Sequence, residues 1–419
     1  MKRRFCLAVV AFASFCACSS GSTNAPSAAG SATPNATASS ATPAAPIATP
    51  PAASPALTLP HGFLAAVVAN VVGARELVFL PGGDLLVGTG GTAIVLVPHA
   101  DAAGLAGEPH GFATLGDAPA QGVAYGAGAI YVATQHHLWS IPYAAGDVTA
   151  SQQRSIASFR QGPVAPGSDG DVHVSASVAL TAGNVFIGIG SSCNACTEVD
   201  PTRATIQRAA LDGSGMSTYA THVRNAIALA VNPATGTLWG GGAGQDGLPG
   251  AHPYEYFDAV TTHAAGADYG WPLCEENRHA YAANADCTNT VVPSVELPAY
   301  ATLIGAAFYP VAQGGPYAFP AAFRGGAFVS AHGSWHTPGG HHVPPRVAYV
   351  AMSGDAPTVA VDWNDPTKQW TDFMSGFQND ANGDARIGRP TGIAVGPQGS
   401  LFVADDLSGN IYRIRPVAP

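Results

Sequence analysis

One short pattern returns six times along the chain, and this repetition limits the fold more than any other feature of the sequence. Each copy is a run of small and apolar residues, a turn with Gly or Pro, and a second run rich in Val, Phe, Leu and Ile, which is typical of a β-hairpin. Most copies are followed by one more strand-like run, as in "AIVLVPH" and "NIYRIRP". The six hairpins begin at Ala74, Gln121, Ala176, Ala226, Ile304 and Pro390.

Six such units predict an all-β fold, a six-bladed β-propeller of four-stranded antiparallel blades over residues 58–419. Radially packed blades leave only short sheet edges exposed. Two β-sandwiches would also supply many strands, but they give no reason for the same hairpin to return six times. The last blade is expected to be closed either by "FLAAVVAN" near the N-terminus or by its own C-terminal strand, and the sequence leaves both open.

The composition agrees with a large β-rich core and narrows the class of partner. Of the 419 residues 47% are hydrophobic and only 11% are charged, and 50 glycines with 34 prolines indicate many turns. The formal net charge is -10 and no basic run is present. Because phosphate binding requires a concentration of lysine and arginine, we expect no nucleic-acid partner and favour a small molecule or a protein.

The N-terminus is typical of an export signal. "MKRRF" supplies the positive charges and "CLAVVAFASF" a ten-residue apolar core, so residues 1–17 are expected to be a signal peptide. The following "SFCAC" resembles a bacterial lipobox, which predicts a lipid on Cys18 and the periplasmic side of the cell envelope as the location. Ordinary cleavage near Ala17 is the alternative. Residues 18–57 are almost only Ala, Pro, Ser, Thr and Gly, which predicts a disordered linker.

Four cysteines remain after the N-terminal segment, and they form two local pairs. Cys193 and Cys196 lie in "SSCNAC", and Cys274 and Cys287 flank a loop of twelve residues. In an exported protein an even number of nearby cysteines indicates two disulfides. A four-thiolate zinc site requires two close C-x-x-C pairs, and only one is present.

Polar residues precede the first strand of each hairpin. In a propeller the innermost strands begin at one end of the central channel, so these residues are expected to converge there. For Arg75 we prefer a structural ion pair with the adjacent Glu76. The repeated placement of polar residues before the inner strands favours a shared ligand pocket, because buried charges without a partner are costly. The residues are Arg75 with Glu76, Gln121, His173, Arg224 with Asn225, Thr302 and Arg389.

The chain resembles the soluble glucose and sorbosone dehydrogenase family, propellers that carry pyrroloquinoline quinone (PQQ) in the channel mouth. The resemblance covers most of residues 58–417, and it rests on the order and spacing of several stretches rather than on any single one. These stretches are "SSCNACTEVDPTRATIQRAALDGSG", "YATHVRNAIALAVNPATGTLW", "DYGWPLC", "AHGSW" and "GRPTGIAVGPQG".

The resemblance implies roles for particular residues. His173 matches the general base that takes the proton of the substrate hydroxyl, and an imidazole suits this task because it titrates near neutral pH. The alternative is a core histidine held by a backbone carbonyl, with Asp171 orienting or only solvating it. Arg224 matches the arginine over the quinone oxygen that becomes negative, a position that suits a permanently charged donor. Asn225 matches a residue at the edge of the cofactor.

Further positions match the binding of the cofactor's carboxylates and of calcium. Gln121 and Arg389 fall where the family places side chains against the carboxylates, and His332 lies where some members have a lysine. The resemblance also implies a Ca²⁺ ion bound by the backbone carbonyls of Gly244 and Gln245, a ligand type that calcium accepts.

The expected function is a PQQ-dependent sugar dehydrogenase. It would oxidise the anomeric carbon or aldehyde of an aldose or sorbosone-like substrate and pass electrons to an acceptor in the envelope. The loop "GGGAGQDGLPG" departs from the family's pattern just before the calcium carbonyls. This departure keeps a second hypothesis open, a catalytically silent propeller that binds a glycan or a protein.

Overall fold

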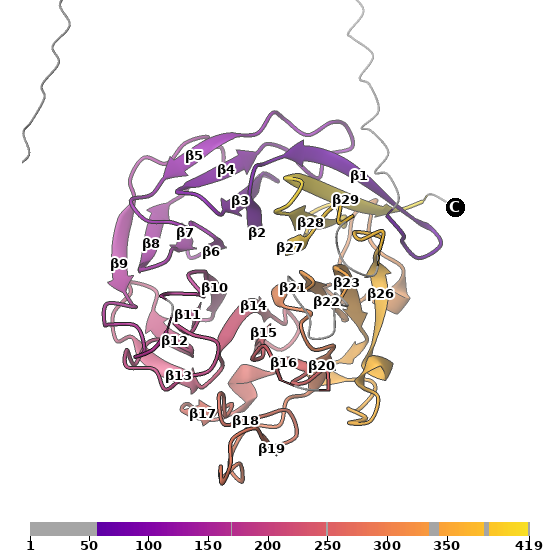
Figure 1. The fold of residues 1–419 in the computed structure, drawn as a ribbon. Helices are drawn as coiled ribbons and strands as arrows, with labels where there is room; N and C mark the ends of the chain where they lie inside the picture. The colour runs from indigo at the N-terminus through magenta and orange to yellow at the C-terminus, as the bar shows by residue number, and fades with distance from the viewer. Residues whose placement is uncertain (1–56, 169, 249, 335–342, 381–384, 418–419) are drawn as a thin grey trace, which may run out of the picture. The chain divides into compact units, whose positions relative to one another are not determined.

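The computed structural model describes residues 57–417 except 169, 249, 335–342 and 381–384. These residues belong to one compact unit that starts at Ala48, and residues 1–47 are a separate unit. The expected signal peptide, Cys18 and all of the linker except its last residue lie outside the described residues. Figure 1 looks down the axis of the described unit, in which sheets follow one another around a central channel.

Six sheets make the propeller, each with four antiparallel strands as the hairpin repeat predicted, and in blade 3 the short β17 (Ala267–Asp268) adds a fifth strand parallel to β13. Blade 1 contains β2 (Ala74–Phe79), β3 (Leu85–Thr89), β4 (Ala93–Val97) and β5 (His110–Thr114). Blade 2 contains β6 (Gly122–Gly126), β7 (Ala129–Ala133), β8 (His137–Pro142) and β9 (Arg154–Ser158). Blade 3 contains β10 (Ala176–Thr181), β11 (Asn184–Ile189), β12 (Thr205–Ala210) and β13 (Ser217–Thr221).

The second half of the chain continues the same arrangement. Blade 4 contains β14 (Asn225–Val231), β15 (Leu238–Ala243), β16 (Glu255–Asp258) and β20 (Val295–Leu297). Blade 5 contains β21 (Leu303–Phe308), β22 (Ala327–Ala331), β23 (Arg346–Val350) and β26 (Trp370–Met374). Blade 6 contains β27 (Pro390–Val395), β28 (Leu401–Asp405), β29 (Asn410–Pro416) and β1 (Phe63–Asn70).

The N-terminal strand closes the ring, which settles the alternative that the sequence left open. β1 pairs antiparallel with β29, from Phe63 opposite Pro416 to Asn70 opposite Asn410. The outermost strand of blade 6 therefore comes from the start of the domain and its other three strands from the end, so that hydrogen bonds between the two ends of the domain hold the ring together.

Short elements besides the four strands of each blade come from three connections. Between β16 and β20 lie η1 (Val260–Thr262), β17 (Ala267–Asp268), β18 (Cys274–Glu275) and β19 (His279–Ala280). Between β21 and β22 lies η2 (Ala321–Phe323), and between β23 and β26 lie β24 (Met352–Ser353), β25 (Ala356–Pro357) and η3 (Pro366–Gln369). Among the described residues no helix is long and apolar enough to cross a membrane.

Both expected disulfides are present. One joins Cys193 to Cys196 in the loop after β11, and the other joins Cys274 to Cys287 in the connection between β16 and β20. Two disulfides agree with an oxidising compartment, and the pairing leaves no cysteine among the described residues for a zinc site.

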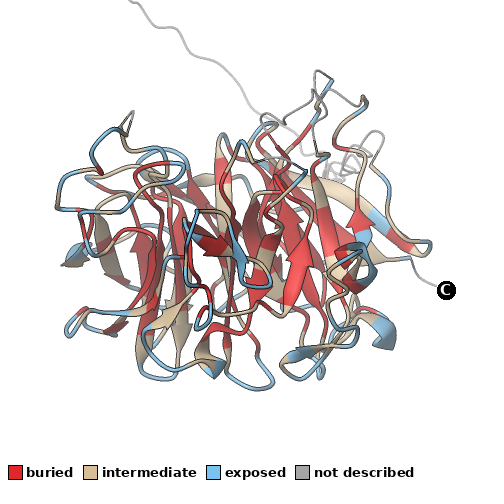
Figure 2. Ribbon diagram, turned by 60° about the horizontal axis from the view of Figure 1, so that its bottom comes forward, coloured by how far each residue is buried: buried red, intermediate tan, exposed pale blue. Residues whose placement is uncertain are grey.

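Buried residues gather in the strands and exposed residues in the loops, as Figure 2 shows in a tilted view. Every residue of β3, β15, β22 and β28 is buried, whereas the outer strand β9 has no buried residue. The first strands of successive blades are neighbours around the channel, in the order β2, β6, β10, β14, β21, β27 and back to β2. Apolar side chains fill the spaces between neighbouring blades, for example around Trp239, Phe257 and Phe308.

Glycines mark the places where the inner strands of neighbouring blades meet backbone to backbone. A Cβ atom on Gly188 would overlap the carbonyl oxygen of Ala226 in the next blade. The same close approach joins four other pairs of blades, so five of the six junctions around the channel require the absence of a side chain. These further pairs are Gly88 with Gln121, Gly122 with Ala176, Gly305 with Thr391, and Gly392 with Arg75.

We expect Gly188→Ala to lower the free energy of unfolding by about 2 kcal/mol, because the added methyl group forces blades 3 and 4 apart. Gly111→Ala is the matched control, since Gly111 lies in the outer strand β5 and a Cβ there meets nothing within 4 Å. Urea unfolding followed by tryptophan fluorescence measures both variants. Equal stability of the two would contradict the assigned role of the glycine contact.

Candidate active site at the channel mouth

The polar residues that precede the inner strands lie around one cavity of about 680 Å³ at the end of the channel. Blades 1, 3, 4, 5 and 6 all contribute to its wall. The predicted convergence is therefore present, and Gly167, Ser168, the segment Val172–Val174 and the loop Cys193–Ala195 complete the rim. The expected residues that line the cavity are Arg75, His173, Arg224, Asn225, Thr302, His332 and Arg389.

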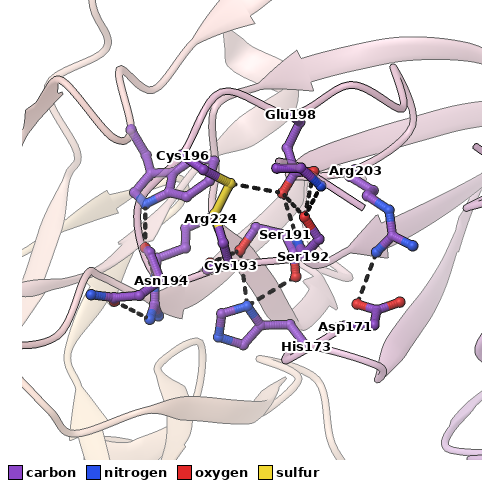
Figure 3. The surroundings of a disulfide bond; sticks show 12 residues. Asp171, His173, Ser191, Ser192, Cys193, Asn194, Cys196, Glu198, Arg203 and Arg224 are labelled. Carbon is purple, nitrogen blue, oxygen red and sulfur yellow. Dashed lines mark hydrogen bonds and ion pairs between the residues drawn. A yellow bond between two sulfur atoms is a disulfide. The ribbon is translucent and has the colours of Figure 1, made fainter. Parts of the chain in front are cut away.

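His173 lies just before β10, and Ser191 orients its ring. Nδ1 lies 2.9 Å from the hydroxyl of Ser191 and 3.1 Å from its carbonyl oxygen (Figure 3). The Ser191 hydroxyl donates in turn to the carbonyl of Cys193, at 2.7 Å. Asp171 does not contact the imidazole and forms an ion pair with Arg203 instead. With Nδ1 donating to Ser191, Nε2 is the unprotonated nitrogen.

A buried arginine fixes the backbone that carries His173. Arg160 is 3% exposed and lies between β9 and β10. Its two terminal nitrogens donate to the carbonyls of His173, Val174 and Ser175, and also to the carbonyl of Gln135. A planar guanidinium matches several carbonyls at once, which a lysine ammonium cannot do with the same geometry. Arg160 therefore sets the path of the segment before β10.

The same environment keeps His173 neutral. Burial and the positive charges of Arg224 and Arg160 lower the pKa of His173 to about 3, while the Ser191 carbonyl raises it. The ring is therefore neutral at neutral pH and can accept a proton, but burial places its pKa below the near-neutral value that the sequence analysis expected.

Arg224 lies directly before the apolar strand β14, and its contacts explain why a charged side chain stands at this position. Its backbone has a φ of 49°, and only 3% of its surface is exposed. Nε donates to the carbonyl of Asn194, Nη2 donates to the side chains of Asn194 and Asp246, and Nη1 donates to the carbonyl of Ala243. Four of its five N–H groups are thus used among the described residues, and the fifth remains for a ligand.

Asn225 and His173 meet above a glycine. A Cβ atom on Gly190 would lie 2.5 Å from both the Asn225 Oδ1 and the His173 Cβ, so this close approach requires glycine. Asn225 is 5% exposed, and its Oδ1 has no hydrogen-bond partner in the described part of the chain. An unpaired buried oxygen in the wall of a cavity indicates a ligand that donates to it.

The expected ion pair between Arg75 and Glu76 is absent. Nη1 of Arg75 instead forms an ion pair with Asp406 at 2.5 Å, and Nε donates to Gln121. Asp406 follows β28 and also accepts from His332 Nε2 at 2.9 Å, so one carboxylate of blade 6 joins blades 1 and 5. Burial tends to raise the pKa of Asp406, but His332 and Arg75 outweigh it and lower the pKa to about 2.

Glu76 instead points into the protein. Burial raises its pKa to about 8 although Arg75 lowers it, and its Oε1 has no hydrogen-bond partner among the described residues. The alternation of a β-strand explains the error, because neighbouring residues at the start of β2 project to opposite faces.

Of the remaining expected residues, two line the main cavity and one lies in an adjoining space. Arg389 donates to the carbonyls of His332 and Gly333 and lines the main cavity, and burial lowers its pKa to about 10. Burial likewise lowers the pKa of His332 to about 4. Gln121 does not line the main cavity; it lies with Arg75 and Asp406 in an adjoining space of about 300 Å³.

The loop expected to hold calcium has an acidic surrounding. The backbone N–H of Gly244 donates to Glu255, whose carboxyl lines the cavity, and the Gln245 amide donates to Glu275. Burial raises the pKa of Glu255 well above its usual value and that of Glu275 to about 7. Among the described residues, one group of three metal-ligand side chains lies close together, Cys193, Cys196 and Glu198, and its sulfurs form a disulfide.

Four residues of the site were missed by the analysis of the sequence. They act from loops whose paths only the assembled blades determine. The weak signal was the position of Asp406 directly after the buried strand β28, of Asn194 inside the C-x-x-C motif and of Ser191 two residues before that motif. The residues are Arg160, Ser191, Asn194 and Asp406.

Comparison with known proteins returns propellers of one kind. The sequence profile described as TrAA12-like matches residues 254–417. A calcium structure of the Trichoderma reesei Carbohydrate-Active Enzymes family AA12 protein has a TM-score of 0.70 and 19% identity, and covers 86% of this chain and 97% of that one. The holo PQQ domain of Coprinopsis cinerea pyranose dehydrogenase has a TM-score of 0.68 and 18% identity, and covers 88% and 98%.

The comparisons thus find a TrAA12-like match over residues 254–417 and solved structures that share the fold at 19% identity or less. The resemblance that the sequence motifs indicated is thereby confirmed. A curated relative from Borreliella burgdorferi, an uncharacterised protein, is 24% identical over 235 residues. The match covers 55% of this chain and 56% of that relative, so it spans little more than half of either protein.

Glu76→Gln tests the burial of this carboxyl through pH. The folded pKa lies above the unfolded one, so Glu76 contributes stability that is complete below pH 4.5 and is lost as pH rises towards 8. The variant should therefore gain stability over the wild type as pH rises from 5 to 8, by on the order of 1 kcal/mol per pH unit. Glu108→Gln, at an exposed position before β5, controls for the lost charge. A pH-independent difference in urea unfolding would contradict this assignment.

Proposed function

We propose that this protein is a PQQ-dependent dehydrogenase that oxidises the anomeric carbon or aldehyde group of an aldose or sorbosone-like sugar. One observation carries the proposal: a neutral buried imidazole, a fixed guanidinium and an unpaired amide oxygen share one cavity, in His173, Arg224 and Asn225. The likeness to AA12 and PQQ-containing proteins supports a sugar oxidoreductase in general.

The residues present fit such a cofactor. PQQ is a planar tricarboxylic quinone, and the cavity of about 680 Å³ is of the size of small-molecule sites. Asn225 Oδ1 needs a donor and one N–H of Arg224 needs an acceptor, which the heterocycle and a quinone oxygen supply. Arg75, Arg389 and His332 place positive or protonatable groups where carboxylates would bind, with Gln121 behind Arg75.

The chain's own groups would move the proton and hold the developing charge. PQQ, when bound, supplies the acceptor for the hydride. Nε2 of His173 accepts the proton of the substrate hydroxyl, because Nδ1 is held by Ser191 and the ring is neutral at working pH. The remaining N–H of Arg224 stabilises the negative charge that develops at the acceptor oxygen. Arg224 needs no rearrangement for this, since Asn194 and Asp246 already fix its plane.

Calcium belongs to the proposal through the loop after β15. The carbonyls of Gly244 and Gln245 would be backbone ligands, with Asp246 and Glu255 lining the cavity beside them. A hard cation there would favour the ionised form of Glu255, whose pKa burial now raises. The proposed setting is the periplasmic side of the envelope, with a lipid on Cys18 as the attachment and an envelope protein or small molecule as electron acceptor.

A second function, a catalytically silent propeller that binds a glycan or protein at the same mouth, is favoured by one observation. No cluster of three carboxylate ligand atoms lies at the calcium loop within the described residues. A sugar hydroxyl would satisfy Asn225 Oδ1 without any redox chemistry.

Reconstitution separates the two functions. The protein is loaded with PQQ and CaCl₂ and mixed with glucose and other aldoses and with a redox dye. We expect a shifted quinone absorbance and sugar-dependent dye reduction. An unchanged quinone spectrum and no dye reduction at saturating cofactor would remove the dehydrogenase and leave the binding protein.

His173→Ala is expected to lower kcat at least about a hundredfold while PQQ affinity changes little, because the imidazole moves the proton and other residues hold the cofactor. Absorbance titration with PQQ measures affinity, and dye reduction measures kcat. The matched control is His61→Ala, an exposed histidine before β1. Wild-type turnover in His173→Ala would exclude His173 as the base.

A further inference from the structure

Asn194 lies inside the C-x-x-C motif and connects the parts of the mouth that the proposed chemistry depends on. Its carbonyl accepts from Arg224 Nε and from Trp271 Nε1, both at 3.0 Å. Its side-chain oxygen accepts from Arg224 Nη2 at 2.8 Å and from the backbone N–H of Asp246 at 2.7 Å. Its amide group donates to the Asp246 carbonyl at 2.9 Å. Five hydrogen bonds of one residue thus join blade 3 to blade 4.

The disulfide adds a covalent restraint to the hydrogen bonds that hold this loop. Residues 190–204 contain no strand or helix, and Asn194 is exposed. The Cys193–Cys196 bond closes a very short loop around Asn194, so Asn194 can take few other positions. The Ser191 hydroxyl that contacts His173 also donates to the Cys193 carbonyl. The same short loop therefore touches both His173 and Arg224.

The two cysteines line different cavities. Cys193 is 7% exposed and lines the main cavity. Cys196 is half-buried and lines a second cavity of about 430 Å³, between the loop after β11 and the connection that carries Cys274. A small thiol therefore reaches Cys196 from outside the mouth.

We propose that Asn194 is a positioning residue for Arg224 and Asp246, and that the Cys193–Cys196 disulfide makes this positioning sensitive to dithiol reductants. The effect on turnover rests on the proposed dehydrogenase function, whereas the effect on the loop does not. The arrangement is carried by the hydrogen bonds of Asn194 and by the two cavities that flank the disulfide.

The reduction balances with a dithiol as the electron donor. A thiolate of the dithiol attacks Cys196 Sγ, the bond between the cysteines breaks, and Cys193 Sγ leaves as a thiolate that takes up a proton. The second thiol of the reductant then displaces Cys196, which also takes up a proton. The protein disulfide gains two electrons and two protons, and the dithiol becomes a cyclic disulfide.

Hydrogen–deuterium exchange tests the positioning without any cofactor. Asn194→Ala should speed amide exchange at least about tenfold in the segments around Arg224 and Asp246, because their shared partner is lost. Asn194→Asp keeps the oxygen acceptors and should change exchange less. Asn184→Ala, in the β11 hairpin turn, is the matched control. Exchange in Asn194→Ala equal to that of Asn184→Ala would overturn the positioning role.

Dithiol treatment tests the disulfide. Wild-type protein is reduced with dithiothreitol, freed of it under anaerobic conditions and loaded with PQQ and calcium. We expect kcat to fall about tenfold with a smaller change in KM, and reoxidation to restore it, because the loss of a charge-assisted hydrogen bond has this size. The Cys193→Ser/Cys196→Ser variant should have the low kcat and no response to the reductant.

The unaltered Cys274–Cys287 bond in that variant is the internal control. A response of the variant equal to that of the wild type would assign the sensitivity to Cys274–Cys287 and overturn the proposal. If the wild type shows no activity at all, the dehydrogenase function has failed. Exchange in the reduced protein then still tests whether the disulfide restrains the Asn194 loop. Unchanged exchange near Arg224 and Asp246 would reject that restraint.

Discussion

The structure depends on the contact between the inner strands of neighbouring blades. At five of the six junctions a glycine lets the backbone of one blade approach the backbone of the next, where a Cβ atom would overlap a carbonyl oxygen or the chain beside it. This close approach keeps the ring of first strands narrow, so the residues that precede those strands come together at one end of the channel. Ion pairs and hydrogen bonds between blades, such as those of Asp406 with Arg75 and His332, then add to this close approach.

Three arginines line the mouth, and removing their charges from water is costly unless they have partners. A few fixed acceptors supply these partners. Arg75 is held by Asp406, Arg224 by Asp246 and Asn194, and Arg389 by backbone carbonyls. These partners leave defined gaps, the Asn225 oxygen and one N–H of Arg224, rather than a general positive surface. A preorganised site of this kind is suited to stabilising charge that develops during a reaction, since its groups do not need to move.

Much of this was visible in the sequence, and the remainder has a physical reason for being hidden. The hairpins, both disulfide pairs and the convergence of His173, Arg224 and Arg389 follow from local patterns and from the geometry of propellers. The partner of Arg75 did not, because Asp406 is 331 residues away and only ring closure brings it near. Nor did the clamp by Arg160, since its acceptors are backbone carbonyls and carry no residue signature.

The sequence by itself determined the blades, because alternation, turns and apolar runs act over a few residues and need no knowledge of the rest of the chain. It also determined which polar residues stand before each inner strand. The tertiary structure alone decided what those residues do to one another. Closure by β1, the pairing of Arg75 with Asp406 and the reach of Asn194 across to Arg224 and Asp246 join segments far apart in the chain. Such contacts form only when the blades concerned are packed side by side around the channel.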